Sequence, residues 1–100
     1  MKGEYDPATD ILRIDLGKRI GKRDQIELPD VIIHLRDRQA AGIDILGASN
    51  DLEAKLDRAA EVSGVQRGSF EDLGELIERP ELIIFVETPL WGEDKDAPRL

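Results

Sequence analysis

The spacing of apolar residues changes near Asn50, and this change restricts the fold more than any other feature of the chain. Before it, Leu12, Ile14 and Leu16 alternate with charged residues, which places three aliphatic side chains on one face of a β-strand. After it, apolar residues recur three or four positions apart, as on one face of an amphipathic helix. A chain of 100 residues holds one domain, and this order of elements predicts the α+β class.

The first half predicts short antiparallel strands separated by turns that contain proline or charged residues. The tip between the last two strands lacks the Asn-Gly pair typical of tight hairpins. In the turn over 6–10, we expect Asp6 and Asp10 to cap the local backbone with their carboxylates. The expected strands span residues 2–5, 12–16, 25–28, 31–35 and 40–46.

The second half predicts two helices and one further strand. Ser49 or Asn50 can cap the first helix, with Glu53 completing a capping box, and Gly64 ends it. A second, shorter helix begins with Ser69 as its cap and closes at Arg79 and Pro80. The apolar run within 81–87 is typical of a strand that is covered on both faces or inserted beside the centre of the sheet.

We therefore expect an antiparallel sheet of about five or six strands, ordered as a meander, with one or two α-helices packed on one face. The domain should span residues 1–91, and the polar stretch 92–100 should form a mobile acidic tail. Short strands over a thin aliphatic core favour pairing with a second copy, so a homodimer is expected.

Several classes of site are disfavoured by composition. The chain has no cysteine and a single histidine, which excludes disulfides, thiolate nucleophiles and histidine-based metal sites, and we expect no metal and no cofactor. The longest apolar run, 82–86, is far shorter than a membrane span. These features predict a cytoplasmic protein that does not enter a membrane.

Charge is divided unevenly along the chain. The net charge is −8, and residues 1–50 contribute only −1 of it, with 8 basic and 9 acidic side chains. The acidic positions Asp57 and Glu61 continue a stripe along the first helix that either faces water or meets a basic partner. Trp91 either seals the edge of the core or anchors an interface.

A basic loop runs from 17 to 23 and repeats Gly-Lys-Arg. It is no phosphate-binding P-loop, because its glycines are one residue too close and Arg23 replaces the required hydroxyl. Lys18, Arg19, Lys22 and Arg23 are either solvated, bound to an acidic protein or bound to nucleic acid. Nucleic acid is the least favoured of these partners, because the chain is acidic and no aromatic residues interleave the loop.

His34 is the only side chain that ordinarily titrates near neutral pH, and its strand position places it opposite its neighbours Ile33 and Leu35. No serine or cysteine nucleophile motif accompanies it, so we predict no catalytic residues and no enzyme, and His34 is interpreted as structural or interfacial.

Two blocks resemble a family of small prokaryotic domains of unknown function. The first is Tyr-Asp-Pro-Ala-Thr-Asp at 5–10 with the strand that follows, and the second is Gly-Ile-Asp-Ile-Leu-Gly-Ala-Ser at 42–49. The resemblance covers about residues 2–50 and implies two opening strands and a later strand that leads into a helix. Some members look like the antitoxin half of toxin–antitoxin pairs, which implies a partner-binding role.

The leading hypothesis is a non-catalytic protein-interaction module, antitoxin-like, that binds a basic protein partner through its acidic half. The alternatives are nucleic-acid binding through loop 18–23 and a small enzyme of unknown reaction.

Overall fold

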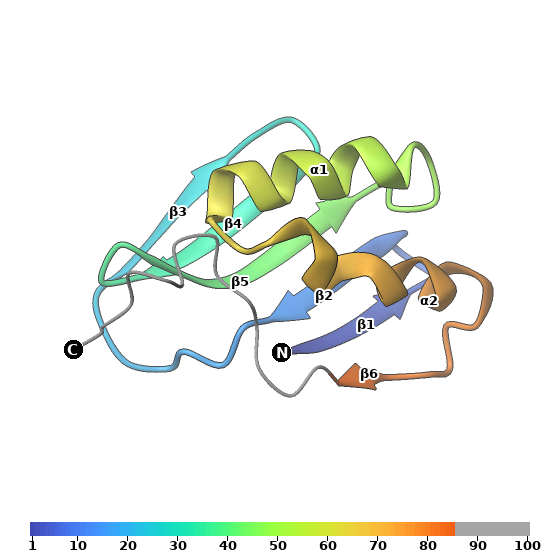
Figure 1. Cartoon of the computed structure of the whole chain (residues 1–100), viewed down its shortest axis with the longest axis horizontal. Helices are drawn as coiled ribbons and strands as arrows, with labels where there is room; N and C mark the ends of the chain where they lie inside the picture. The colour runs from blue at the N-terminus through green and yellow to red at the C-terminus, as the bar shows by residue number, and fades with distance from the viewer. Residues whose placement is uncertain (86–100) are drawn as a thin grey trace.

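The chain folds as an open antiparallel sheet with helices on one face, which confirms the predicted α+β class (Figure 1). The computed structural model describes residues 1–85. Its elements are β1 (Lys2–Asp6), β2 (Ile11–Asp15), β3 (Arg23–Glu27), β4 (Val31–Arg36), β5 (Gln39–Leu46), α1 (Leu52–Ser63), the 3-10 helix η1 (Arg67–Gly74), α2 (Glu75–Glu78) and β6 (Ile84–Phe85).

The sheet has six strands in the order β3-β4-β5-β2-β1-β6. Each sequential hairpin is antiparallel, and β5 turns back to pair with β2 from Ile11–Leu46 to Asp15–Gly42. The meander-like order thus joins two groups of strands, β3-β4-β5 and β2-β1-β6, through the central pairing of β5 with β2. Among the described residues, β3 and β6 form the two edges.

Strand β6 corrects the prediction for the apolar run over 81–87. Within the described residues, only Ile84 and Phe85 pair, and they pair with β1 at the edge of the sheet. Phe85 is 72% exposed, so the strand is neither central nor covered on both faces. The centre of the sheet is formed by β5 and β2, which pair with each other over five positions and leave no place for β6 between them.

The core lies between the sheet and the helices, because alternate strand residues point to that side. In Figure 1, α1 lies across β4 and β5, while η1 and α2 lie over the β1 side of the sheet. Phe70, in η1, is fully buried. The largest fully buried side chains around it are aliphatic, as the composition requires: Leu12, Val31, Ile33, Ile43, Ile45, Leu56, Leu73 and Leu76.

One turn differs from its predicted form. The tip of the β4–β5 hairpin is only Asp37 and Arg38, which both adopt left-handed backbone angles with φ of 51° and 69°. Two consecutive left-handed residues match the twist of a hairpin even without Asn-Gly. The strands therefore extend one residue further into the tip on each side than predicted.

The helix starts also differ from the prediction. α1 is preceded by Asp51 with φ of 54° and has no side-chain cap, because the Ser49 hydroxyl is bonded elsewhere. Gly64 ends α1 in a left-handed conformation, as predicted. The second helical segment begins as a 3-10 helix, and Ser69 is buried within it instead of capping it.

Candidate functional site

The sheet face opposite the helices carries the candidate site. No helix covers this face among residues 1–85, and the strands alternate polar residues along it. One row of register partners crosses the sheet as Gln25, His34, Gly42, Asp15 and Lys2. The next row places Asp44 beside Arg13, which in turn pairs with Glu4. We call this surface the open face.

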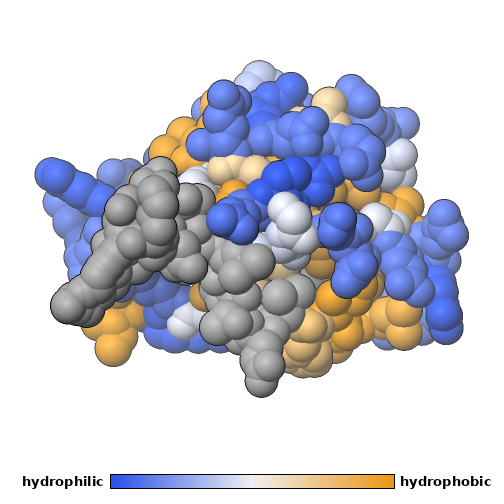
Figure 2. Space-filling view, viewed as in Figure 1, coloured by the Kyte–Doolittle hydropathy of each residue, from blue (hydrophilic) through white to orange (hydrophobic). Residues whose placement is uncertain are grey.

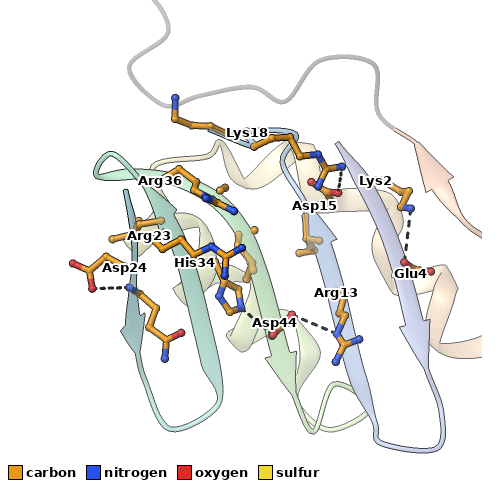
Figure 3. A pocket seen from close by; sticks show the side chains of 17 residues that line it. Lys2, Glu4, Arg13, Asp15, Lys18, Arg23, Asp24, His34, Arg36 and Asp44 are labelled. Carbon is orange, nitrogen blue, oxygen red and sulfur yellow. Dashed lines mark hydrogen bonds and ion pairs between the residues drawn. The ribbon is translucent and has the colours of Figure 1, made fainter. Parts of the chain in front are cut away.

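A hollow of about 670 Å³ lies on the open face over Gly42, which has no side chain to fill the centre of its row (Figure 3). Six cationic side chains and four carboxylates line it. The cationic residues come from four strands, β1 to β4, and from the loop between β2 and β3: Lys2, Arg13, Lys18, Arg19, Arg23 and Arg36. The acidic residues are Glu4, Asp15, Asp24 and Asp44.

Asp44 holds the floor of the hollow together. Its carboxylate lies 3.0 Å from His34 Nε2 and 3.7 Å from Arg13 Nε, so it joins β4 to β2 across β5 (Figure 3). All three side chains are partly exposed, and each ion pair of this kind contributes little to stability. Their consequence is positional: His34 and Arg13 are held on either side of Gly42.

Asp15 organises the rim. Its carboxylate accepts hydrogen bonds from the Gly17 amide at 2.8 Å and from Arg19 at 2.9 Å. Partial burial opposes ionisation, but these two donors outweigh it, and the pKa of Asp15 lies below its ordinary value. Asp15 is therefore a carboxylate at neutral pH, and it neutralises the charge of Arg19 through their hydrogen-bonded ion pair.

Three cationic groups at the hollow have no carboxylate partner within the described part of the chain. They are Lys18, Arg23 and Arg36, and Arg36 donates only to the Gly21 carbonyl at 3.2 Å. In Figure 3, Arg23 and Arg36 extend over the hollow from β3 and β4. Cationic groups that remain unpaired beside a concave surface can bind an anionic group, and arginine presents a planar fork that fits phosphate or carboxylate.

The predicted basic loop is divided by the fold. Lys18, Arg19 and Arg23 line the hollow, and Arg23 belongs to strand β3 instead of the loop. Lys22 does not line it, because its backbone is fixed to Asp37 by reciprocal bonds of 2.9 Å. The sequence pattern therefore found half of the hollow's cations.

The other cations and Gly42 were missed. Lys2, Arg13 and Arg36 lie on different strands, and His34 was interpreted as structural or interfacial. Their alternation with apolar residues was a usable signal, because it places them on the same face of the sheet. The local pattern does not predict the order of the strands, which brings these residues together.

The predicted acidic positions lie on the helical layer, on the opposite side of the molecule. Arg67 contacts Glu53 and Asp57 at 2.6 Å each, so it neutralises part of the predicted stripe. Glu61 is exposed and has no ion pair within residues 1–85. Figure 2 shows a largely hydrophilic surface over these helices. Trp91 and the tail 92–100 lie outside the described residues.

The two sequence blocks that resemble a known family meet at one corner. Asp10 adopts φ of 56° and accepts three hydrogen bonds: from the Tyr5 hydroxyl at 2.6 Å, the Ser49 amide at 2.9 Å and the Ser49 hydroxyl at 2.8 Å. Asp6 caps its own turn through Ala8 and Thr9, as predicted. Asp10 instead ties the β1–β2 turn to the segment after β5, which corrects the prediction of a local cap.

This corner shifts two pKa values in opposite directions. The hydrogen bond from Tyr5 and the two from Ser49 lower the pKa of Asp10, because they stabilise its carboxylate. The same bond to Asp10 raises the pKa of Tyr5, because ionised tyrosine has no proton to donate and would face a negative charge. The corner is therefore a structural clamp that requires charged Asp10 and neutral Tyr5.

Two further properties of the described residues bear on the site. Among residues 1–85, no group of three or more histidine, aspartate or glutamate side chains is arranged to hold a metal ion. Over the same part of the chain, no helix has the length and apolarity needed to cross a membrane.

The fold and the site define an α+β domain with one covered and one open sheet face, the latter carrying a cationic hollow. Residues 2–49 match the family described as "Protein of unknown function (DUF2283)", which confirms the predicted resemblance to a family of small domains of unknown function. The match spans β1 to β5 and ends at Ser49, in the Tyr5–Asp10 corner. Neither a curated protein nor a solved structure matches the chain.

Proposed function

We propose that this protein is a non-catalytic binding module whose open face takes a small anionic ligand of the phosphate or carboxylate class. One observation carries the proposal: Lys18, Arg23 and Arg36 converge on a single hollow without carboxylate partners in residues 1–85, although the chain as a whole has a net charge of −8. A volume of about 670 Å³ suits a ligand of small-molecule size.

A small ligand fits this hollow better than nucleic acid does. The lining includes four carboxylates and no phenylalanine, tyrosine or tryptophan, so a long polyanion would meet repulsion and lack the large aromatic side chains on which successive bases stack. Nucleic-acid binding through loop 18–23 remains the alternative that the same experiment tests.

The module is proposed to be non-catalytic because of what surrounds His34. Its Nε2 is engaged by Asp44, and the residues that line the hollow include no serine, threonine, cysteine or tyrosine to act as a nucleophile. The His34–Asp44 pair is therefore assigned a positioning role, and a small enzyme of unknown reaction ranks last.

The test places a charge at the centre of the hollow. An added Cβ at Gly42 would lie 3.4 Å from the Ile14 carbonyl oxygen and 3.9 Å from His34, so the strand has room for a side chain. Gly42→Glu should weaken binding of inorganic phosphate or a nucleoside monophosphate about tenfold or more. NMR chemical-shift changes of His34 and of the strand that contains Gly42 measure the binding. Gly42→Gln is the matched control, because it adds the same bulk without the charge and should retain more of the affinity.

Two results would contradict this proposal. One is the absence of phosphate-induced shifts on the open face at millimolar ligand. The other is equal binding by Gly42→Glu and the unmodified chain. Gel shift of a single-stranded oligonucleotide that is lost when Lys18, Arg19, Lys22 and Arg23 all become alanine would favour the nucleic-acid alternative.

A second candidate function is supported by the helical layer. Residues 51–85 hold nine acidic side chains, all exposed, against four basic ones. Glu61 and Asp72 are exposed and have no ion pair within residues 1–85, so their charge is available to a basic protein partner. An antitoxin-like role in the cytoplasm belongs to this candidate.

An oligolysine peptide tests the helical layer. Arg67→Ala frees Glu53 and Asp57 from their ion pairs and should tighten peptide binding at low salt, whereas Glu61→Lys should weaken it. Arg13→Ala on the open face is the control, and it should leave the affinity for the oligolysine peptide unchanged. Shifts that appear on the open face instead of α1 would remove this candidate.

A further inference from the structure

Strand β3 leaves the backbone groups of one full edge without a partner strand in the described chain. The hydrogen bonds from the Leu28 amide to Val31 at 2.8 Å and from the Asp37 amide to Lys22 at 2.9 Å fix which residues bond to β4. Because bonded and unbonded positions alternate in an antiparallel pair, the amides and carbonyls of Arg23, Gln25 and Glu27 face outward. The Gln25 amide indeed donates to the neighbouring Asp24 carboxylate at 2.8 Å, not to β4.

The side chains on this edge are poorly matched within one molecule. Arg23 lies directly opposite Arg36 in the β3–β4 register, and like charges in opposite positions are unfavourable. Glu27 lies opposite Ile32, and within residues 1–85 its carboxylate accepts a hydrogen bond only from the Gln25 side-chain amide. One edge therefore carries an unpaired cation and, four residues along, an exposed anion.

We propose that β3 pairs with β3 of a second copy of this chain, antiparallel and with Gln25 facing Gln25. In this register, Arg23 of each copy lies opposite Glu27 of the other on the open face, and all three outward backbone positions form ladder hydrogen bonds. A shift of two residues in either direction breaks both charge pairs. The register is thus specified by charges that have no good partner in the single copy.

Such pairing has a geometric consequence for the open face. A two-fold axis perpendicular to the sheet joins the two sheets into one and keeps all helices on the same side. The two hollows then lie on the same face, on either side of the axis. Arg23 pairs with Glu27 of the second copy in this dimer, so Lys18 and Arg36 are the cations of each hollow that keep no carboxylate partner within residues 1–85. Within residues 1–85, the pairing also covers the longer of the two edge strands, since β6 has two residues there.

Mass measurement by sedimentation equilibrium of the full chain tests the proposal. The unmodified chain should approach twice its 11.2 kDa mass as concentration rises into the tens of micromolar. Arg23→Glu and Glu27→Arg should each raise the dissociation constant about tenfold or more, because each places two like-charge pairs at the axis. The double variant R23E/E27R restores complementarity and should recover most of the dimer.

Two matched variants complete the experiment. Asp24→Ala removes the carboxylate that competes for the Gln25 amide and should tighten the dimer. Glu4→Arg changes the same charge on β1, away from this edge, and should leave the mass unchanged. All β3 residues are exposed, so these substitutions leave the core intact, which circular dichroism verifies.

Three outcomes would overturn the proposal. They are a monomer at every concentration for both the unmodified chain and Asp24→Ala, a dimer that neither charge reversal weakens, and a double variant no better than the single ones. Glu27 does not line the hollow, so phosphate binding by Glu27→Arg reports on the proposed function separately.

Discussion

The two faces of this sheet are built from alternate residues of the same strands, yet one face is a buried apolar core and the other is a charged open surface. On β2, Leu12 and Ile14 are buried under the helices, while Arg13 between them points to the open face. On β5, Ile43 and Ile45 flank Asp44 in the same way. A strand with a period of two can therefore specify a core and a charged surface independently, so the open face can change without cost to the fold.

The largest predicted difference between the faces is at Leu12 and Arg13. Leu12 is fully buried, so Leu12→Ala should reduce the free energy of unfolding by about 2–5 kcal/mol. Arg13 makes only a partly exposed contact with Asp44 at 3.7 Å, and Arg13→Ala should cost less than about 1 kcal/mol. Urea denaturation followed by circular dichroism measures both. Similar losses at the two positions would show that something covers the open face.

Two glycines give a sharper comparison. An added Cβ at Gly3 would lie 2.6 Å from Leu73 Cδ2 under the helices, so Gly3→Ala should destabilise the fold by about 1–3 kcal/mol as Leu73 moves. At Gly42, on the open face, the nearest atom would be at 3.4 Å, and Gly42→Ala should be neutral or stabilising by up to about 1 kcal/mol. Destabilisation by both would contradict the assignment of Gly42 to an unfilled surface.

A smaller effect is expected at the corner of Tyr5, Asp10 and Ser49, which lies at the end of both faces. Asp10 has a lowered pKa, so its contribution is present above the ordinary value of 3.8 and is lost as the pH falls through the lower folded value. Tyr5 has a raised pKa, so its contribution is present below 10.0 and is lost as the pH rises through the higher folded value.

Thermal unfolding from about pH 2 to about pH 11 measures this dependence. Tyr5→Phe should lower the midpoint at neutral pH, flatten the alkaline decline and reduce the acid decline, because Asp10 keeps only its Ser49 partners. Parallel curves for the two proteins across the whole range would show that the hydrogen bond is not formed in solution.

Local pattern predicted what depends on neighbours in sequence. The alternation at 12–16 identified β2, and Gly64 marked the end of α1. The predictions that were wrong each depended on a distant partner. Ser49 was expected to cap α1, but it bonds Asp10, 39 residues away. The apolar run that includes Ile84 looked like a central strand, but pairing with β1 leaves it at an edge.

The sequence by itself determined that this chain forms strands and then helices, that its core is aliphatic, and that its excess of negative charge lies in the second half. These properties follow from the order and spacing of residue types. Only the tertiary structure decided which charges meet. Pairing of β5 with β2 brings Arg13 and Asp44 together across 31 positions of chain and sets Gly42 at the centre of the open face. Strand order depends on pairing between segments that are distant in sequence, and local periodicity does not specify it.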